Sequence, residues 1–229
     1  MHQRQLSFIS DSLQGNGRKT NKDGILLISD ENYYILGVLD GVSTAKGARK
    51  AVHYAIRYLT KKHNRFLKES TFDLAGMLYE LNRALSSTGI EDPFSTCSLA
   101  YIPRESSQKI KILSLGDSRV YSVSKQYLLQ LTVDHKDSIR NNILTKYLGA
   151  KDLTLKDFAE IEYSENEQSL LICTDGFYSV IESDPENLAE LHRVLNLQAI
   201  HFIQKGIGKV IHGFNKDDAS YIFIRWGNV

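Results

Sequence analysis

The sequence has little cysteine, little proline and no excess of either charge, and each shortage excludes a class of protein. Only 2 cysteines occur in 229 residues, so no disulfide framework is expected and a reducing compartment is the default. The 3 prolines and 15 glycines leave little room for a long flexible linker. With 28 Lys and Arg against 27 Asp and Glu, the chain lacks the basic surplus that is typical of nucleic-acid binders, so no nucleic-acid partner is expected.

Long apolar runs are missing as well. Residues 1–17 contain no apolar core of signal-peptide type, and the longest apolar runs fall far short of a membrane span. We therefore expect a cytoplasmic protein without a membrane partner. The composition, 42% hydrophobic and 24% charged, is typical of a globular protein, and the length suits one domain, 1–229, with a sizeable core.

The N-terminal half carries strand-like blocks and then helix-like ones. Residues 25–30 and 33–39 are rich in β-branched and aromatic side chains around a turn-like Asp-Glu-Asn cluster, which predicts a hairpin. From Ala45, small and apolar residues recur at helical spacing. A second helix is predicted over 71–86, with Ser70 as its N-cap.

The C-terminal half begins with a run of strands. Consecutive antiparallel strands are predicted at 95–102, 109–115, 119–124 and 127–133. The other predicted elements are a short helix over 139–148 that ends at Gly149, a strand over 168–174, helical material at roughly 185–205, and a closing strand over 220–226. Strands and helices thus occur in runs and not in regular βαβ alternation, which favours an α+β domain of antiparallel sheet with helices outside.

Two apolar strands end in the same dipeptide. The strand over 33–39 runs into Asp40-Gly41, and the strand over 168–174 runs into Asp175-Gly176. Asp-Gly is also a common hairpin turn, but helix-like sequence follows each pair. A carboxylate at the end of a buried strand is costly unless it meets a cation, and carboxylate and carbonyl oxygens are the ligands that Mg²⁺ and Mn²⁺ prefer.

Three further aspartates stand next to predicted strands. They are Asp23 before the first strand, Asp117 at the junction of two strands, and Asp217 before the last strand. Each by itself is compatible with an ordinary turn or cap. If two or three of these side chains converge with Asp40 and Asp175, they form a divalent-metal site of the two-metal hydrolytic kind.

Ordered motifs along the chain resemble one family. They are R-x-x-N-x-D at 18–23, D-G at 40–41, S-T-C at 95–97, G-D-S-R-V-Y at 116–121, L-T-x-D-H at 131–135, N-x-L-T-x-x-L-G at 142–149, C-T-D-G-F at 173–177 and D-D-A-S at 217–220. In this order they resemble the bacterial-type metal-dependent protein Ser/Thr phosphatases, the PPM or type-2C family, from Arg18 to Trp226. The resemblance implies a four-layer α-β-β-α sandwich of two antiparallel sheets flanked by helices, with a metal cleft at one end.

The resemblance also implies a role for each matching residue. Asp40 would bridge two Mn²⁺ or Mg²⁺ ions with help from the Gly41 carbonyl, Asp175 and Asp217 would complete the second ion, and Asp23 would bind directly or through water. Arg18 would grip the substrate phosphate with its bidentate guanidinium. The implied reaction is hydrolysis of phosphoserine and phosphothreonine in proteins by a metal-bridging hydroxide, in opposition to a Ser/Thr kinase.

Four positions depart from the family pattern: Lys22, Val42, Phe94 and Ser179. Ser179 stands where the family has an Asp that shares a third metal with the residue matching Asp117, so a third ion at Asp117 stays an open alternative. The departures also keep a second interpretation open, in which a catalytically weak relative binds a phosphoprotein or partner without turnover.

Two rival chemistries fail on the residues. A cysteine-dependent phosphatase needs a C-x₅-R loop, but Pro103 and Ser179 stand six residues beyond the two cysteines. A Ser118-His135-Asp134 triad fails because neighbouring residues on a strand point to opposite faces and no G-x-S-x-G elbow is present. We interpret His135 as a structural partner in a turn.

Overall fold

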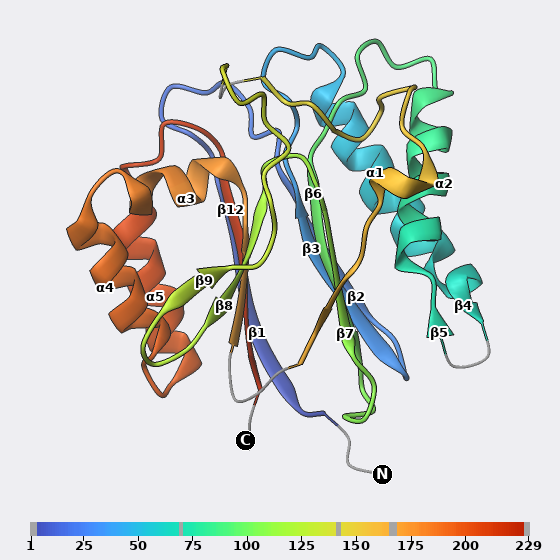
Figure 1. Cartoon of the computed structure of the whole chain (residues 1–229). Helices are drawn as coiled ribbons and strands as arrows, with labels where there is room; N and C mark the ends of the chain where they lie inside the picture. The colour runs from blue at the N-terminus through green and yellow to red at the C-terminus, as the bar shows by residue number, and fades with distance from the viewer. Residues whose placement is uncertain (1–3, 69–70, 141–142, 165–168, 227–229) are drawn as a thin grey trace.

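The computed structural model of the chain describes residues 4–68, 71–140, 143–164 and 169–226. Two five-stranded antiparallel sheets face each other, and helices cover the outer face of each (Figure 1). The predicted four-layer α+β sandwich is therefore confirmed. None of the described helices combines the length and the apolar character that a membrane crossing requires.

One sheet is formed by strands from both ends of the chain, in the order β1-β12-β11-β8-β9. Their bounds are β1 Leu6–Leu13, β8 Arg119–Val123, β9 Leu128–Gln130, β11 Ser169–Cys173 and β12 Ala219–Trp226. β1 is a strand that the sequence pattern did not predict, and it pairs with β12 along its whole length.

The other sheet has the order β10-β7-β6-β3-β2. Its strands are β2 Gly24–Ser29, β3 Tyr33–Leu39, β6 Cys97–Pro103, β7 Ile110–Leu115 and β10 Ile161–Tyr163. The predicted hairpin is confirmed, because β2 pairs antiparallel with β3 from Gly24 opposite Leu39 to Ser29 opposite Tyr34.

Apolar side chains fill all three spaces between the four layers. Along β3, Leu36 and Val38 face the sheet that contains β12, while Ile35 and Leu39 face the helices. Successive residues of a strand point to opposite faces, so a strand that is covered on both sides is apolar throughout. This is why the sequence of β3 shows no polar alternation.

Five α-helices lie within the described residues. α1 (Ala48–Lys62) and α2 (Leu74–Ser86) cover the sheet that contains β3. α3 (Asp175–Glu182), α4 (Pro185–Leu195) and α5 (Ile200–Ile211) cover the sheet that contains β12 (Figure 1). Smaller elements are the 3₁₀ turns η1 (His63–Phe66) and η2 (Leu155–Asp157) and the strand pair β4 (Leu67–Lys68) and β5 (Thr71–Phe72).

The helix predicted over 139–148 is wrong. Its described residues form no helix, and the backbone of Leu148 pairs with Ser95 instead, through N···O distances of 2.8 and 3.2 Å. Ile139 is 91% exposed while Leu148 is fully buried, so the two ends of the segment do not share one buried face. Tertiary bridges satisfy the backbone groups that a helix would have used.

The second helix begins later than predicted. Thr71 belongs to β5, and Asp73 is the N-cap of α2, where its side chain accepts a hydrogen bond from the Gly76 N–H at 2.8 Å. Ser70, the predicted cap, and Gln168, the predicted first residue of a strand, lie outside the described residues. An Asp side chain that accepts from the first helical turn fixes a helix start more firmly than sequence periodicity does.

Two further predictions need correction. The four central strands are not one antiparallel run, because β7 and β8 belong to opposite sheets and β9 spans only Leu128–Gln130. The helical material predicted at roughly 185–205 is present as two helices, α4 and α5, but it extends to Ile211. The crossing from β7 to β8 matters for the site, since Gly116 and Asp117 lie in it.

Candidate functional site

Four of the predicted aspartates meet at one end of the sandwich. Asp40 follows β3, Asp117 lies between β7 and β8, Asp175 follows β11, and Asp217 precedes β12. All four line one pocket of about 420 Å³. The remaining lining residues are Val42, Ser43, Thr44, Phe94, Thr96, Ile143, Leu144 and Tyr147. The two sheets thus bring carboxylates from distant parts of the chain together.

Main-chain contacts fix Asp40 in place. Its carbonyl accepts from the Thr96 N–H at 2.7 Å, and its own N–H donates to the Thr96 hydroxyl at 3.2 Å. The Thr96 hydroxyl is in turn 2.7 Å from that of Ser118. Gly41 fits because a Cβ there would lie 3.0 Å from both the Lys22 carbonyl oxygen and the Ala48 Cβ. Sequence reasoning gave Thr96 no role, since only the fold places it beside Asp40.

Asp23 lies behind this pocket. Its carboxylate accepts a hydrogen bond from the Thr174 hydroxyl at 2.9 Å, while its Oδ1 is buried with no hydrogen-bond partner. Burial raises the pKa of Asp23 to about 8, and the charge of nearby Asp218 adds to the shift. A buried carboxylate oxygen without a partner is unfavourable unless a proton or another cation neutralises the group.

The ionised forms of Asp40 and Asp175, which follow β3 and β11, are also unfavourable. Burial raises the pKa of Asp40 well above its usual range, with repulsion from Asp23, Asp175 and Asp117 adding to it. Burial and repulsion from Asp117 and Asp217 raise the pKa of Asp175 to about 6. The Asp40 carboxyl group acts on the pKa of both Asp23 and Asp175, so it is close to each of them. These three side chains therefore form a continuous group of carboxyls that repel one another when ionised.

The other two aspartates of the pocket have cationic partners from the protein. The Arg18 guanidinium pairs with Asp217 at the mouth of the site, where each side chain is about one-third exposed. The Lys136 ammonium lies 2.8 Å from Asp117. The structure thus brings Arg18 to Asp217, one of the carboxylates that line the pocket.

Asp218 holds the segment that carries Arg18 and Asp23. Its buried carboxylate accepts from the Gly15 N–H at 2.8 Å and from the Lys22 N–H at 2.7 Å. The Lys22 ammonium donates to the Ser43 carbonyl at 2.8 Å. The adjacent Asp217 was the only member of this pair that the sequence singled out.

The donor set suits a hard divalent cation. Asp23, Asp40 and Asp175 present carboxylate oxygens with too little positive charge to balance them, and one buried oxygen has no partner. Within the described residues, no three His, Cys, Asp or Glu side chains converge closely enough to hold an ion as they stand. The carboxyls meet in pairs around Asp40. In chemistry the residues fit Mg²⁺ or Mn²⁺, whose charge would relieve the repulsion.

The rival hydrolytic sites do not form. His135 Nδ1 accepts from the Gly116 N–H at 3.2 Å, Asp134 binds Arg119, and the Ser118 hydroxyl bonds to Thr96. His135 is therefore a structural partner in a turn, as predicted. Both cysteines are fully buried, and burial raises the pKa of each thiol.

Comparison with known proteins gives the family. Residues 16–204 match the family described as Protein phosphatase 2C. The chain belongs to the protein phosphatase 2C family. By family it is a protein serine/threonine phosphatase of the PPM type found in bacteria.

Relatives agree in sequence and in fold. Serine/threonine phosphatase stp of Listeria monocytogenes serotype 4b (strain F2365) is 26% identical over 220 residues, which cover 84% of this chain and 86% of that protein. The structure of serine/threonine phosphatase Stp1 from Staphylococcus aureus matches with a TM-score of 0.75 and 19% identity, over 98% of this chain and 96% of that chain. RsbX, solved in complex with magnesium, matches with a TM-score of 0.70 and 17% identity, over 99% of this chain and all of that chain (100%).

The departures from the phosphatase 2C pattern have structural explanations. The Lys22 ammonium bonds to a main-chain carbonyl and not to a carboxylate. The Ser179 hydroxyl donates to the Asp175 carbonyl at 2.6 Å, one turn back in its own helix. Phe94 packs against Tyr147 with ring centroids 4.9 Å apart. Val42 lines the carboxylate pocket as an apolar side chain.

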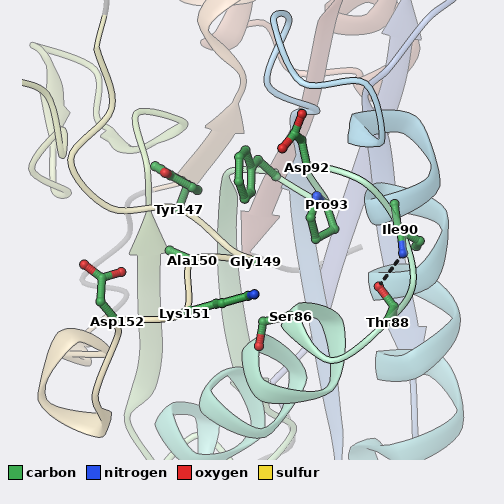
Figure 2. Close-up of a pocket in the computed structure, with 11 residues that line it drawn as sticks. Ser86, Thr88, Ile90, Asp92, Pro93, Tyr147, Gly149, Ala150, Lys151 and Asp152 are labelled. Atoms are coloured by element: carbon green, nitrogen blue, oxygen red, sulfur yellow. Dashed lines mark hydrogen bonds between the residues drawn. The ribbon is translucent and has the colours of Figure 1, made fainter.

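Phe94 and Tyr147 line two neighbouring pockets. Beyond them lies a second pocket of about 330 Å³ between the end of α2 and the segment after Tyr147 (Figure 2). Its other lining residues are Ser86, Thr88, Ile90, Asp92, Pro93, Gly149, Ala150, Lys151 and Asp152.

Proposed function

We propose that the protein hydrolyses phosphoserine and phosphothreonine in proteins with the help of two Mn²⁺ or Mg²⁺ ions. The observation that carries this proposal is the group of Asp23, Asp40 and Asp175, whose charge the protein does not balance, with Arg18 at the mouth of the same pocket. The Listeria relative bears the name of a serine/threonine phosphatase, and RsbX was solved with magnesium.

Asp23, Asp40, Asp175, Asp217 and the Gly41 carbonyl would hold the ions. Divalent ions, when bound, lower the pKa of water and balance the charge of a phosphoryl group. Arg18 would bind the phosphate through its planar guanidinium, and Asp217, its partner in the structure, keeps it at the pocket mouth. Thr96 and Asp218 hold the segments that present these groups.

A phosphoprotein is the substrate that this proposal requires. An opposing Ser/Thr kinase, a cytoplasmic location and a single domain over 1–229 belong to the same proposal. The carboxylates and Arg18 lie at one end of the sandwich, beside a pocket of about 420 Å³. We expect a phosphorylated side chain of a protein substrate to enter this pocket.

Hydrolysis assays with two substrates test the proposal. An aryl phosphate and a phosphothreonine peptide are incubated with the protein in Mn²⁺, in Mg²⁺ and in EDTA, and phosphate release is measured. We expect turnover in either metal, none in EDTA, and turnover on the order of 10³-fold lower for Asp40→Asn. Asp11→Asn, an exposed aspartate on β1, is the matched control and retains activity.

The same protein samples distinguish the second interpretation. A catalytically weak module would bind the phosphothreonine peptide in a calorimetric titration but release no phosphate. Peptide binding without metal-dependent turnover would reject the proposed hydrolysis and favour the binding module.

A further inference from the structure

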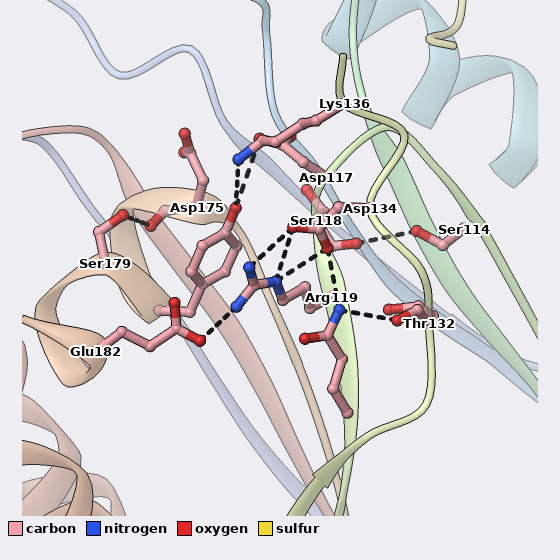
Figure 3. Close-up of polar contacts among 12 residues, drawn as sticks. Ser114, Asp117, Ser118, Arg119, Thr132, Asp134, Lys136, Asp175, Ser179 and Glu182 are labelled. Atoms are coloured by element: carbon pink, nitrogen blue, oxygen red, sulfur yellow. Dashed lines mark hydrogen bonds and ion pairs between the residues drawn. The ribbon is translucent and has the colours of Figure 1, made fainter. Parts of the chain in front are cut away.

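Asp117 differs from its neighbours because a lysine reaches it inside the site. The Lys136 Nζ lies 2.8 Å from Asp117 Oδ2, and the two side chains are 26% and 8% exposed. The same Nζ is 3.1 Å from the Tyr178 hydroxyl, which is 3.5 Å from the same Asp117 oxygen (Figure 3). Lysine, carboxylate and phenol therefore form a closed triangle.

The backbone holds Lys136 in this position. The preceding residue, His135, donates its N–H to the Gly116 carbonyl at 2.9 Å and accepts from the Gly116 N–H through its ring. Its carbonyl accepts from the Thr145 N–H at 2.8 Å, and Lys136 forms a β-bridge with Leu144. Since Gly116 directly precedes Asp117, the two partners sit on segments that are bonded to each other.

A second cation fixes the third member of the triangle. The Arg119 guanidinium lies 3.6 Å from the centre of the Tyr178 ring. Its Nε and Nη2 donate to the Asp134 carboxylate at 2.8 to 3.2 Å. It also pairs with Glu182 on α3. Stacking of a guanidinium on the ring keeps the Tyr178 hydroxyl directed at Lys136 and Asp117.

Position 179 of α3 adds no carboxylate beside Asp117. Ser179 follows Tyr178 and stands one turn beyond Asp175, where its hydroxyl bonds back to the Asp175 carbonyl. The cation that faces Asp117 is thus the protein's own ammonium.

On the basis of the proposed function, we infer that Lys136 is the resident counter-ion of Asp117. Its ammonium takes the place that a bound cation would take at this carboxylate, so Asp117 provides no metal site. Lys136 is a positioning residue that sets how many divalent ions the cluster binds. Because an ammonium is tethered and a metal ion is not, the charge at Asp117 stays balanced at any metal concentration.

Calorimetric titration with Mn²⁺ alone tests the inference by counting ions. Lys136→Met keeps the length of the side chain without its charge, Lys136→Arg keeps a cation, and Lys125→Met removes a charge beyond the opposite end of β8. We expect Lys136→Met to bind one Mn²⁺ equivalent more than the wild type, and the other two variants to match the wild type. The additional equivalent disappears in Lys136→Met combined with Asp117→Asn.

Asp117→Asn by itself gives an independent check if Lys136→Met fails to fold, as judged by circular dichroism. Asp117→Asn should bind as many Mn²⁺ ions as the wild type, because Asp117 binds no metal ion when Lys136 is its counter-ion. Loss of an equivalent in Asp117→Asn, or an unchanged count in folded Lys136→Met, overturns the inference. Failure of the proposed function would show differently, as a wild type that binds no Mn²⁺ or releases no phosphate.

Discussion

Two kinds of carboxylate lie at this end of the sandwich, and they differ in whether a cation of the protein pairs with them. Asp117 and Asp217 each pair with a cation of the protein, Lys136 and Arg18. Asp23, Asp40 and Asp175 contact one another instead. The paired group sits at strand junctions that face long basic side chains. The unpaired group lies around the start of β2 and the ends of β3 and β11. The difference places the strongest demand for an external cation at the unpaired group, while Asp217 joins the proposed ion site from its border with Arg18.

The largest effect is expected at the centre of the unpaired group. Asp40→Asn should lower kcat/KM for the phosphothreonine peptide by on the order of 10³-fold, because Asp40 touches both other unpaired carboxyls. The same variant should raise the melting temperature of the metal-free protein, because it removes a buried charge. Activity close to that of Asp11→Asn would show that Asp40 is no different from a surface aspartate.

The pH dependence of stability should separate the two groups next. In the unfolded chain these carboxyls ionise near pH 3.8, whereas in the folded, metal-free protein the pKa of Asp175 is about 6 and that of Asp23 about 8. Between these values the unfolded chain has lost protons that the folded protein keeps. Raising the pH through this range therefore lowers stability, and the contributions of these two groups are lost as the pH passes their folded-state pKa values of about 6 and about 8.

We expect the melting temperature of the EDTA-treated protein to fall by on the order of 5 °C between pH 5 and pH 8, relative to Asp40→Asn measured in parallel. Added Mg²⁺ should remove most of this difference at pH 8, because it binds the ionised carboxylates of the folded state only. Parallel curves for the two proteins without metal would contradict the assignment of an unpaired group.

A smaller effect is expected at the paired Arg18. Arg18→Lys keeps the charge beside Asp217 but loses the planar fork, so KM for both phosphorylated substrates should rise roughly tenfold with metal binding unchanged. Arg193→Lys, in the exposed ion pair with Glu190 on α4, is the matched control. An equal response of the two variants would mean that Arg18 does not contact phosphate.

The smallest effect concerns the aromatic pair between the two pockets. Phe94→Ala removes the ring that packs on Tyr147 and should change KM for the phosphothreonine peptide by about two- to fivefold, while the aryl phosphate is unaffected. The exposed Phe202→Ala on α5 serves as control. Equal effects on both substrates would place Phe94 outside peptide recognition.

Residue patterns within one segment were enough to predict the elements whose structure depends on that segment alone. The hairpin of β2 and β3 follows from two strand-like blocks around a turn, and α1 follows from its helical spacing. The segment over 139–148 has apolar residues at similar spacing but forms bridges to Ser95 and Lys136. Periodicity cannot tell these cases apart, because the competing hydrogen-bond partners are distant in sequence.

The sequence by itself determined the layered α+β class, the family and the aspartates that the pocket collects. Motifs and strand ends are local, so they can be read from the order of residues. Only the tertiary structure decided which of those aspartates receives a protein cation. Lys136 follows a motif that assigns it no role, and it reaches Asp117 because His135 is bonded to Gly116 across two segments. Charge balance depends on distances between distant segments, and folding alone sets those distances.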